Sequence, residues 1–418
     1  MYRPETAIEV PWTRRRFWAD ARRSVPVNVW LLGLTSLFTD VSAEMVASVL
    51  PAYLMLGLGL SPLAYGAVEG LHVGATVATR WLGGAVADWW GRYKGVALLG
   101  YGLSAACRAG LLLVGGSPAG IAGVIAADRL GKGLRTAPRD ALISLSATAG
   151  GLAQAFGVHR ALDAAGALMG PLLAVLVLRA LPGAYDVVFV TSCAVAIIGV
   201  AVLAAFVRDV PGPIAPASRP SLVAALALVR QPAVGRIALA AGALGLVTAS
   251  DGLLYVALQA SVGFPAHWLP LLSVGTAATF LLLAIPVGML ADRWGRPRVF
   301  VYGHLALLLV HAALLAPIAG PWMPIAVAVL LGVYYAATDG VLMALASAVV
   351  PADQRGSGLA LAATASSLGR MGAALGFGVL WSTWSRDVAV VAFALALACS
   401  LALVRPLLRA ATPDGDPS

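Results

Sequence analysis

The sequence predicts an all-α membrane protein that crosses the bilayer twelve times, built as two six-helix bundles in parallel repeat. Three observations support this fold class: an apolar composition, twelve apolar stretches, and a short motif that occurs twice. Of the 418 residues, 60% are hydrophobic and 11% are charged, whereas soluble domains carry about 25% charged residues. So few charges cannot cover a water-facing surface, which excludes a soluble enzyme and a nucleic-acid-binding protein.

The apolar stretches are each long enough to span a bilayer, which takes roughly 20 residues. Helices are expected because a helix satisfies its own backbone hydrogen bonds in lipid, and the stretches lack the alternation of a membrane β-barrel. The stretches lie near residues 27–55, 63–87, 95–114, 120–143, 157–178, 187–207, 237–259, 268–290, 299–317, 322–347, 358–381 and 388–408.

The longest polar connection divides six stretches from six. It is rich in proline and carries four arginines, from Arg208 to Arg236. The predicted organisation is a basic N-terminus over 1–26, an N-terminal bundle over 27–207, a linker over 208–236, a C-terminal bundle over 237–408 and a tail over 409–418.

Basic residues outside the stretches gather on one side of the predicted membrane. The termini and the even-numbered connections carry most of them, and the opposite connections hold only Arg179 and Arg386. By the positive-inside rule, both termini are expected in the cytoplasm, with the chain in the cytoplasmic (inner) membrane. The net charge of +9 is therefore a topology signal, and no nucleic-acid partner is expected.

A nine-residue motif follows the second stretch of each half. The sequence GAVADWWGR at 84–92 recurs as GMLADRWGR at 288–296. A repeat in register across two halves indicates an internal duplication. Parallel duplication of six-helix units is found in carriers that open alternately to the two sides of a membrane.

This motif, G-x-x-x-D-x-x-G-R, resembles the loop motif of the major facilitator superfamily, and the likeness covers nearly the whole chain. The resemblance implies the fold of that family and the function of a secondary transporter. In that family the motif latches the two halves in one conformational state, a role that the resemblance gives to Asp88, Arg92, Asp292 and Arg296. Plain topology charges are the alternative explanation of these four residues.

Two further motifs match that family in part. The segment Arg129 to Gly133, RLGKG, resembles the R-x-x-Q-G pattern of the fourth span. The segment Gly166 to Pro171, GALMGP, resembles a fifth-span motif associated with antiporters, although the glycines that follow it there are absent here. Small residues four apart also serve helix packing. The resemblance thus favours antiport, and a finer likeness is to a sparsely characterised prokaryotic subgroup.

Ionisable residues within spans are costly and usually face a cavity or a partner. Here they are concentrated in the N half, so we expect charge chemistry there and mainly shape from the C half. The N-half spans hold Asp40, Glu44, Glu69, Asp128, Asp140, Asp163, Arg80, Arg108, Arg129, Lys132, Arg135, Arg139 and Arg160, and the C-half spans contribute Asp251, Asp339 and Arg370.

Four of these acids are candidates for proton coupling: Asp40, Glu44, Glu69 and Asp163. Asp40 and Glu44 lie one helical turn apart. Coupling needs a carboxyl group whose surroundings change between states, because burial and nearby charges decide whether it holds a proton. The alternative is that the acids and bases pair off and only hold the bundle together.

A second set is expected to supply counter-charges or substrate contacts. Asp128, Lys132 and Arg135 follow helical spacing on the fourth span, and Arg129 is the candidate counter-charge to the coupling acids. Asp251, Tyr255 and Asp339 offer polar tips in the C half. Aromatic and polar tips with few charges suit a small amphipathic or cyclic organic molecule. The basic stripe on the fourth span instead suits an anionic metabolite or a metal chelate.

The leading interpretation is proton-coupled efflux of a small organic molecule; the alternative is proton-coupled transport of an anion or chelate in either direction. The expected partners are the lipid bilayer, the substrate and protons, with the chain as a monomer. No enzyme activity, cofactor or metal site is expected, because a nucleophile–base constellation, ligand spacing and a phosphate loop are missing from the sequence. A transport-inactive sensor or scaffold is the least favoured possibility, since the motif acids and the first-span acids are present.

Overall fold

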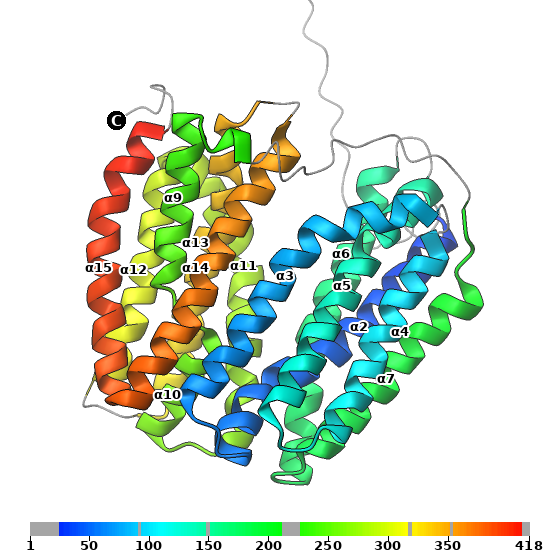
Figure 1. Cartoon of the computed structure of the whole chain (residues 1–418), viewed down its shortest axis with the longest axis horizontal. Helices are drawn as coiled ribbons and strands as arrows, with labels where there is room; N and C mark the ends of the chain where they lie inside the picture. The colour runs from blue at the N-terminus through cyan, green and yellow to red at the C-terminus, as the bar shows by residue number, and fades with distance from the viewer. Residues whose placement is uncertain are drawn as a thin grey trace, which may run out of the picture.

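The computed structural model describes residues 25–90, 93–147, 151–210, 226–316, 320–351 and 354–411. Within these ranges the chain is helical throughout its regular structure and contains no strand. The helices form two bundles that stand side by side (Figure 1). This arrangement confirms the predicted fold class.

The N-terminal bundle holds the first six spans. They are α2 (Val27–Pro51) with the π-helical turn η1 (Ala52–Gly57), α3 (Pro62–Trp90), α4 (Tyr93–Leu113), α5 (Pro118–Ser146), α6 (Leu152–Ala180) and α7 (Tyr185–Phe206). Each corresponds to one predicted apolar stretch. Pro138 lies inside α5, and the helix continues past it to Ser146.

The C-terminal bundle holds the other six spans. They are α9 (Pro232–Leu246) followed by α10 (Asp251–Val262), α11 (Leu269–Trp294) preceded by the 3-10 turn η2 (Ala266–Trp268), α12 (Arg296–Leu315), α13 (Met323–Val349), α14 (Arg355–Thr383) and α15 (Arg386–Ala411). Among the described residues, nine of the twelve spans are long and apolar enough to cross a membrane by length and composition alone.

The seventh span differs from the single helix predicted over 237–259. It begins earlier, at Pro232, where a proline is favourable because the first turn of a helix needs no N–H donor there. It then breaks between Leu246 and Asp251 and restarts as α10. The Ser250 side chain caps the restarted helix by accepting a hydrogen bond from the backbone N–H of Leu253 at 3.5 Å.

The two bundles touch along two seams, where α3 packs on α14 and α6 on α11, while α10 meets α2. They lie close together at the lower end of Figure 1 and diverge at the upper end, where α2 begins and α15 ends. At the lower contact, glycines without a Cβ atom allow the backbones of α3 and α14 to approach closely. A Cβ on Gly66 of α3 would lie 2.3 Å from the backbone oxygen of Ala374, and one on Gly378 of α14 would lie 2.6 Å from that of Pro62.

Candidate functional site

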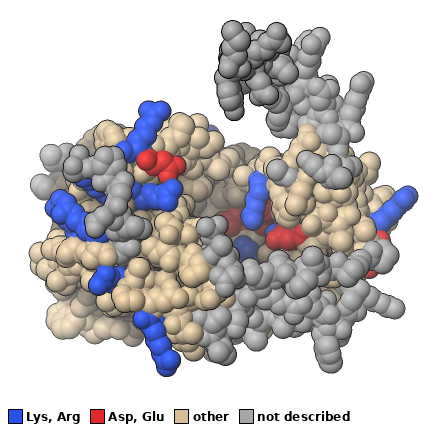
Figure 2. Space-filling model, turned by 90° about the horizontal axis from the view of Figure 1, so that it is seen from above, with Lys and Arg blue, Asp and Glu red and all other residues tan. Residues whose placement is uncertain are grey.

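A cavity of about 420 Å³ lies between the two bundles. Seen from the end where α2 begins and α15 ends, the molecule is hollowed between its halves, and charged side chains lie in the hollow (Figure 2). Helices of both halves supply the walls. The charged and polar residues that line the cavity are Glu44, Tyr65, Glu69, His72, Arg108, Asp128, Arg129, Thr248, Ser250, Asp251, Tyr255, Ser273, Thr276, Tyr335, Asp339 and Arg370.

Asp128 of α5 is held by two arginines in the N-half wall. The Arg108 Nη2 atom lies 3.1 Å from its Oδ1 and the Arg129 Nη2 atom 2.5 Å from its Oδ2. The Arg108 Nε–H donates a further hydrogen bond to Ser42 at 3.3 Å. The Asp128 and Arg108 side chains are 5% and 6% exposed. Arg129, the predicted counter-charge, is therefore bound to Asp128 and also interacts electrostatically with Glu69.

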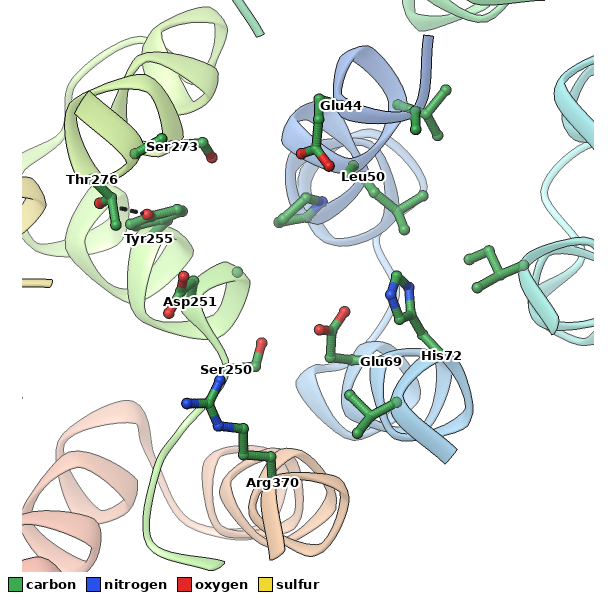
Figure 3. Close-up of a pocket in the computed structure, with 18 of the residues that line it drawn as sticks. Glu44, Leu50, Glu69, His72, Ser250, Asp251, Tyr255, Ser273, Thr276 and Arg370 are labelled. Carbon is green, nitrogen blue, oxygen red and sulfur yellow. Dashed lines mark hydrogen bonds between the residues drawn. The ribbon is translucent and has the colours of Figure 1, made fainter. Parts of the chain in front are cut away.

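Glu69 and Asp251 face the cavity from opposite halves. Glu69 comes from α3 and Asp251 from the first turn of α10, and the two carboxylates interact electrostatically (Figure 3). The Tyr65 hydroxyl donates to Glu69 at 3.5 Å, and the Tyr335 hydroxyl donates to both Asp251 oxygens at 2.9 Å. Within the described part of the chain, neither carboxylate has a Lys or Arg nitrogen within 4.0 Å. The same holds for Glu44.

The C-half wall contains a second charged pair. The Arg370 Nη2 atom lies 3.6 Å from Asp339 and donates to the Tyr334 hydroxyl at 3.2 Å, while the guanidinium lies over the Tyr335 ring, 5.6 Å from its centroid. Asp251, Asp339 and Arg370 thus all line the cavity. The C half contributes charge as well as shape, contrary to the expectation from charge counts.

The lower end of the cavity is closed by a contact between the halves. A Cβ on Gly252 of α10 would lie 2.0 Å from the Tyr65 hydroxyl oxygen and 2.9 Å from Pro51 Cγ. The Tyr65 side chain also lies near the Ser250 side chain, and both line the cavity. Tyr65 therefore touches the coupling candidate Glu69 on its own helix and the break in the seventh span on the other half.

Four predicted residues lie together elsewhere in the N half. Asp40 of α2 and Asp163 of α6 face one another as a close pair of carboxyl groups that interact electrostatically. The Arg135 Nη2 atom lies 4.0 Å from Asp40, and its guanidinium stacks over Tyr101 at 4.6 Å from the ring centroid. Lys132 interacts electrostatically with Asp40 and with Glu44 of the cavity. Asp40, Asp163, Lys132 and Arg135 are absent from the described lining of the cavity.

The fifth-span motif has a packing role. A Cβ on Gly166 would lie 2.5 Å from the Leu37 oxygen, and one on Gly170 would lie 2.6 Å from the Val41 oxygen. These glycines allow α6 to lie directly on α2, which places Asp163 beside Asp40.

The repeated loop motif is visible in its C-half copy. The Arg296 Nη2 atom lies 2.9 Å from Asp292, one turn earlier, and Nη1 donates to the Ala344 backbone oxygen at 3.5 Å. Both contacts lie within the C half. The Asp88 side chain and Arg92 lie outside the described residues.

Sequence reasoning missed several hydroxyl residues of the lining. One of them is Thr276. Its hydroxyl lies 2.9 Å from that of the predicted residue Tyr255 and donates to the Ala328 backbone oxygen at 3.2 Å. Tyr65 and Ser250 were also missed. Only Ser250 carried a recognisable signal, because a serine directly before an aspartate is typical of a helix start.

Comparisons with known proteins place the chain in a family. The family model of the Major Facilitator Superfamily matches residues 32–373 and 237–417. An uncharacterized MFS-type transporter of Methanocaldococcus jannaschii is 29% identical over 371 residues, which cover 86% of this chain and 89% of that protein. An uncharacterized protein of Mycobacterium tuberculosis is 33% identical over 144 residues, which cover 34% of this chain and 35% of that protein.

Solved structures share the fold at low identity. The nucleoside transporter NupG matches with a TM-score of 0.77 at 16% identity, over 91% of this chain and 98% of that one. The peptide transporter POT in complex with sulfate matches with a TM-score of 0.72 at 15% identity, over 94% and 97%. An inward-facing bacterial homologue of the lysosomal transporter Spinster matches with a TM-score of 0.67 at 15% identity, over 92% and 95%. The chain, with its two six-helix bundles around a charged central cavity, belongs to the Major Facilitator Superfamily and is a multi-pass membrane transporter.

Proposed function

We propose that this transporter couples the movement of a small polar organic molecule across the cytoplasmic membrane to the movement of protons. The observation that carries the proposal is the position of Glu69 and Asp251. They lie on opposite halves, face one cavity and, among the described residues, have no Lys or Arg nitrogen within 4.0 Å. When the halves rock against each other, the surroundings of both carboxylates change, which is what a coupling group requires.

The geometry supports a cycle in which the present conformation faces the cytoplasm. The cavity is open toward the end where α2 begins and α15 ends, and the positive-inside rule assigns that end to the cytoplasm. The other end is closed by the packing of Tyr65 on Gly252. Opening this contact would expose Glu69 and Asp251 to the opposite side. One chain supplies both walls of the cavity, so the proposed transporting unit is a monomer.

Asp40 and Asp163 form a second carboxyl pair in this proposal. Two carboxyl groups that lie close together can share one proton, which the protonated group donates to the other. The pair lies within electrostatic reach of Lys132, which also interacts with Glu44 in the cavity. Together these groups offer a proton a series of stations between the open end and the cavity.

The proposed direction is export in exchange for protons, which rests on the likeness of the fifth-span motif to that of antiporters. Because Gly166 and Gly170 also pack α6 on α2, the direction has to be measured. Uptake is the alternative. Transport of an anion or chelate is less well supported, since Lys132 and Arg135 are not part of the described lining and Arg108 and Arg129 are held by Asp128.

The test is proton movement in proteoliposomes that contain an internal pH dye, screened with amphipathic drugs, organic acids and metal chelates. A substrate-dependent pH change is expected, and its sign separates antiport from symport. Glu69→Gln is expected to remove the pH change. The matched control is Asp387→Asn, which alters an exposed carboxylate at the start of α15 that is paired with Arg386. A cargo that crosses without any pH change would contradict proton coupling.

A further inference from the structure

The arginines of the cavity already have carboxylate partners. Arg108 and Arg129 are both bound to Asp128, and Arg370 lies 3.6 Å from Asp339. An anionic ligand would have to compete with a carboxylate for each of these arginines. Because Arg108 and Arg129 share one carboxylate, and the Arg129 Nε atom has no hydrogen-bond partner among the described residues, that cluster keeps a net positive charge. The described lining as a whole still holds more carboxylates than guanidinium groups: Glu44, Glu69, Asp128, Asp251 and Asp339 against Arg108, Arg129 and Arg370.

Negative charge is available in the same cavity. Glu44, Glu69 and Asp251 point into it (Figure 3), and no Lys or Arg nitrogen of the described chain lies within 4.0 Å of their oxygens. Among the described residues, the close hydrogen-bond donors to the two that face each other across the halves, Glu69 and Asp251, are tyrosine hydroxyls. A hydroxyl satisfies part of a carboxylate's hydrogen bonding and none of its charge.

Aromatic side chains share the cavity lining with these carboxylates. Tyr65 and Tyr255 are buried, with 2% and 5% of their surface exposed. Phe280 and Tyr335 also line the cavity, although the Tyr335 ring already lies under the Arg370 guanidinium. The negative faces of aromatic rings attract organic cations, and this attraction is strongest where water is excluded. Carboxylates set among tyrosine rings are thus complementary to an ammonium group carried on an apolar body.

We infer that the substrate is a small organic cation whose charged nitrogen binds between Glu69 and Asp251. The inference rests on the proposed function, because it assigns the cargo of the same cavity. The volume of about 420 Å³ lies within the range of roughly 300–1,000 Å³ that is usual for sites of small organic ligands.

Protons and the cation compete for the same two carboxylates, which provides an exchange mechanism. The charged and titratable groups that face Glu69 are Tyr65 on its own helix, Arg129 on α5 and Asp251 on α10. Those that face Asp251 are Tyr255 on its own helix, Tyr335 and Asp339 on α13, Arg370 on α14, and Tyr65 and Glu69 on α3. Protonation of either acid removes one of the two negative charges that hold the cation, so binding a proton favours release.

Binding to the purified full-length chain in detergent, measured by isothermal titration calorimetry, tests the inference without any gradient. Two permanently charged probes of similar size are compared: benzyltrimethylammonium as the cation and benzenesulfonate as the anion. The cation is expected to bind, more weakly at about pH 6 than at about pH 8, because protons displace it. The sulfonate is expected to bind at least roughly tenfold more weakly than the cation. Preferential binding of the sulfonate, or no binding of the cation, would overturn the inference.

Variants locate the site. Glu69→Gln and Asp251→Asn keep the shape of each side chain, and each is expected to weaken cation binding roughly tenfold or more. Asp387→Asn, outside the cavity, is expected to leave it unchanged. Size-exclusion profiles that match the unsubstituted protein show that the variants are folded. Unaltered affinity in both cavity variants would place the cation elsewhere and overturn the inference.

The two proposals fail in different ways. If the cation binds as expected but causes no pH change in proteoliposomes, proton coupling is rejected and the cation site stands. If an anion or a neutral compound drives the pH change, proton coupling stands and the cation site is rejected.

Discussion

The two halves of this transporter carry very different numbers of charges in their spans, yet both place charged side chains in the cavity. In the N half most charged side chains are bound to one another, as in the cluster of Arg108, Asp128 and Arg129. In the C half the few charges line the cavity, and tyrosines rather than opposite charges supply close donors to Asp251.

This difference teaches that the count of charges in a span says little about which of them meet a substrate. A buried charge next to an opposite charge is mainly structural, because its partner has already replaced water. A carboxylate whose close donors are hydroxyls can still bind a cation or a proton. By this criterion Glu69 in the N half resembles Asp251 in the C half more than it resembles Asp128.

The largest expected effect is on stability, from Asp128→Asn. The substitution leaves Arg108 and Arg129 buried together without a carboxylate, which costs about 3–5 kcal/mol. The corresponding C-half change, Asp339→Asn, removes a carboxylate that is 53% exposed, and its expected cost is under about 1 kcal/mol. Thermal unfolding of the two variants in detergent, followed by tryptophan fluorescence, measures the difference. Equal shifts of the unfolding temperature would contradict the distinction between the halves.

The next largest effect is expected on proton coupling, in the variant Asp40→Asn. The amide can donate a hydrogen bond to Asp163 and so replaces the shared proton, which leaves the fold intact. Loss of the titrating group is expected to slow proton movement roughly a hundredfold. The pH-dye assay measures this rate, and calorimetry is expected to show substrate binding within about twofold of the original. Unchanged pH-driven transport would remove Asp40 from the mechanism and leave its pairing purely structural.

A smaller shift is expected from Gly252→Ala. The new Cβ would lie 2.0 Å from the Tyr65 hydroxyl oxygen, and it strains only the conformation in which this contact is closed. Overpacking of about 2 kcal/mol changes the ratio of the two conformations roughly thirtyfold. A thiol reagent that cannot cross membranes, applied from the face opposite the termini, is expected to label Ser273→Cys in the cavity faster in this variant.

The labelling experiment needs a background in which Cys107, Cys193 and Cys399 are replaced by alanine. Its matched control is Gly123→Ala on α5, where an added Cβ has no neighbour within 4 Å. Labelling that rises equally in both variants would show that the contact of Tyr65 with Gly252 does not close the cavity.

These predictions use features that hydropathy could and could not reveal. The positions of the twelve spans were predictable, because the length of an apolar stretch is fixed by the thickness of the bilayer. The break before Asp251 was not, since Val247, Thr248 and Ala249 continue the apolar run and leave the hydropathy of the stretch unchanged. Helical spacing likewise placed Asp40 near Glu44.

Spacing along one helix could not show that the neighbour of Asp40 is Asp163, because contacts between helices depend on which spans pack together. The same limit applies to the cavity. Glu69 and Asp251 were both predicted as candidates, but their position opposite one another depends on the packing of α3 and α10 across the two halves.

The smallest expected change in stability comes from Asp292→Asn. The Asp292 side chain is 65% exposed and that of its partner Arg296 is 40% exposed. Loss of this ion pair is therefore expected to lower the free energy of unfolding by under about 1 kcal/mol. If the repeated motif latches the halves, the transport rate still falls severalfold, since a latch acts on the balance of conformations rather than on folding. Asp387→Asn removes a similarly exposed carboxylate, 62% exposed and paired with Arg386, without touching the motif. If the Asp292→Asn variant transports as fast as this control, the motif charges are topology signals. The same comparison with Asp88→Asn would test whether the two halves share the role.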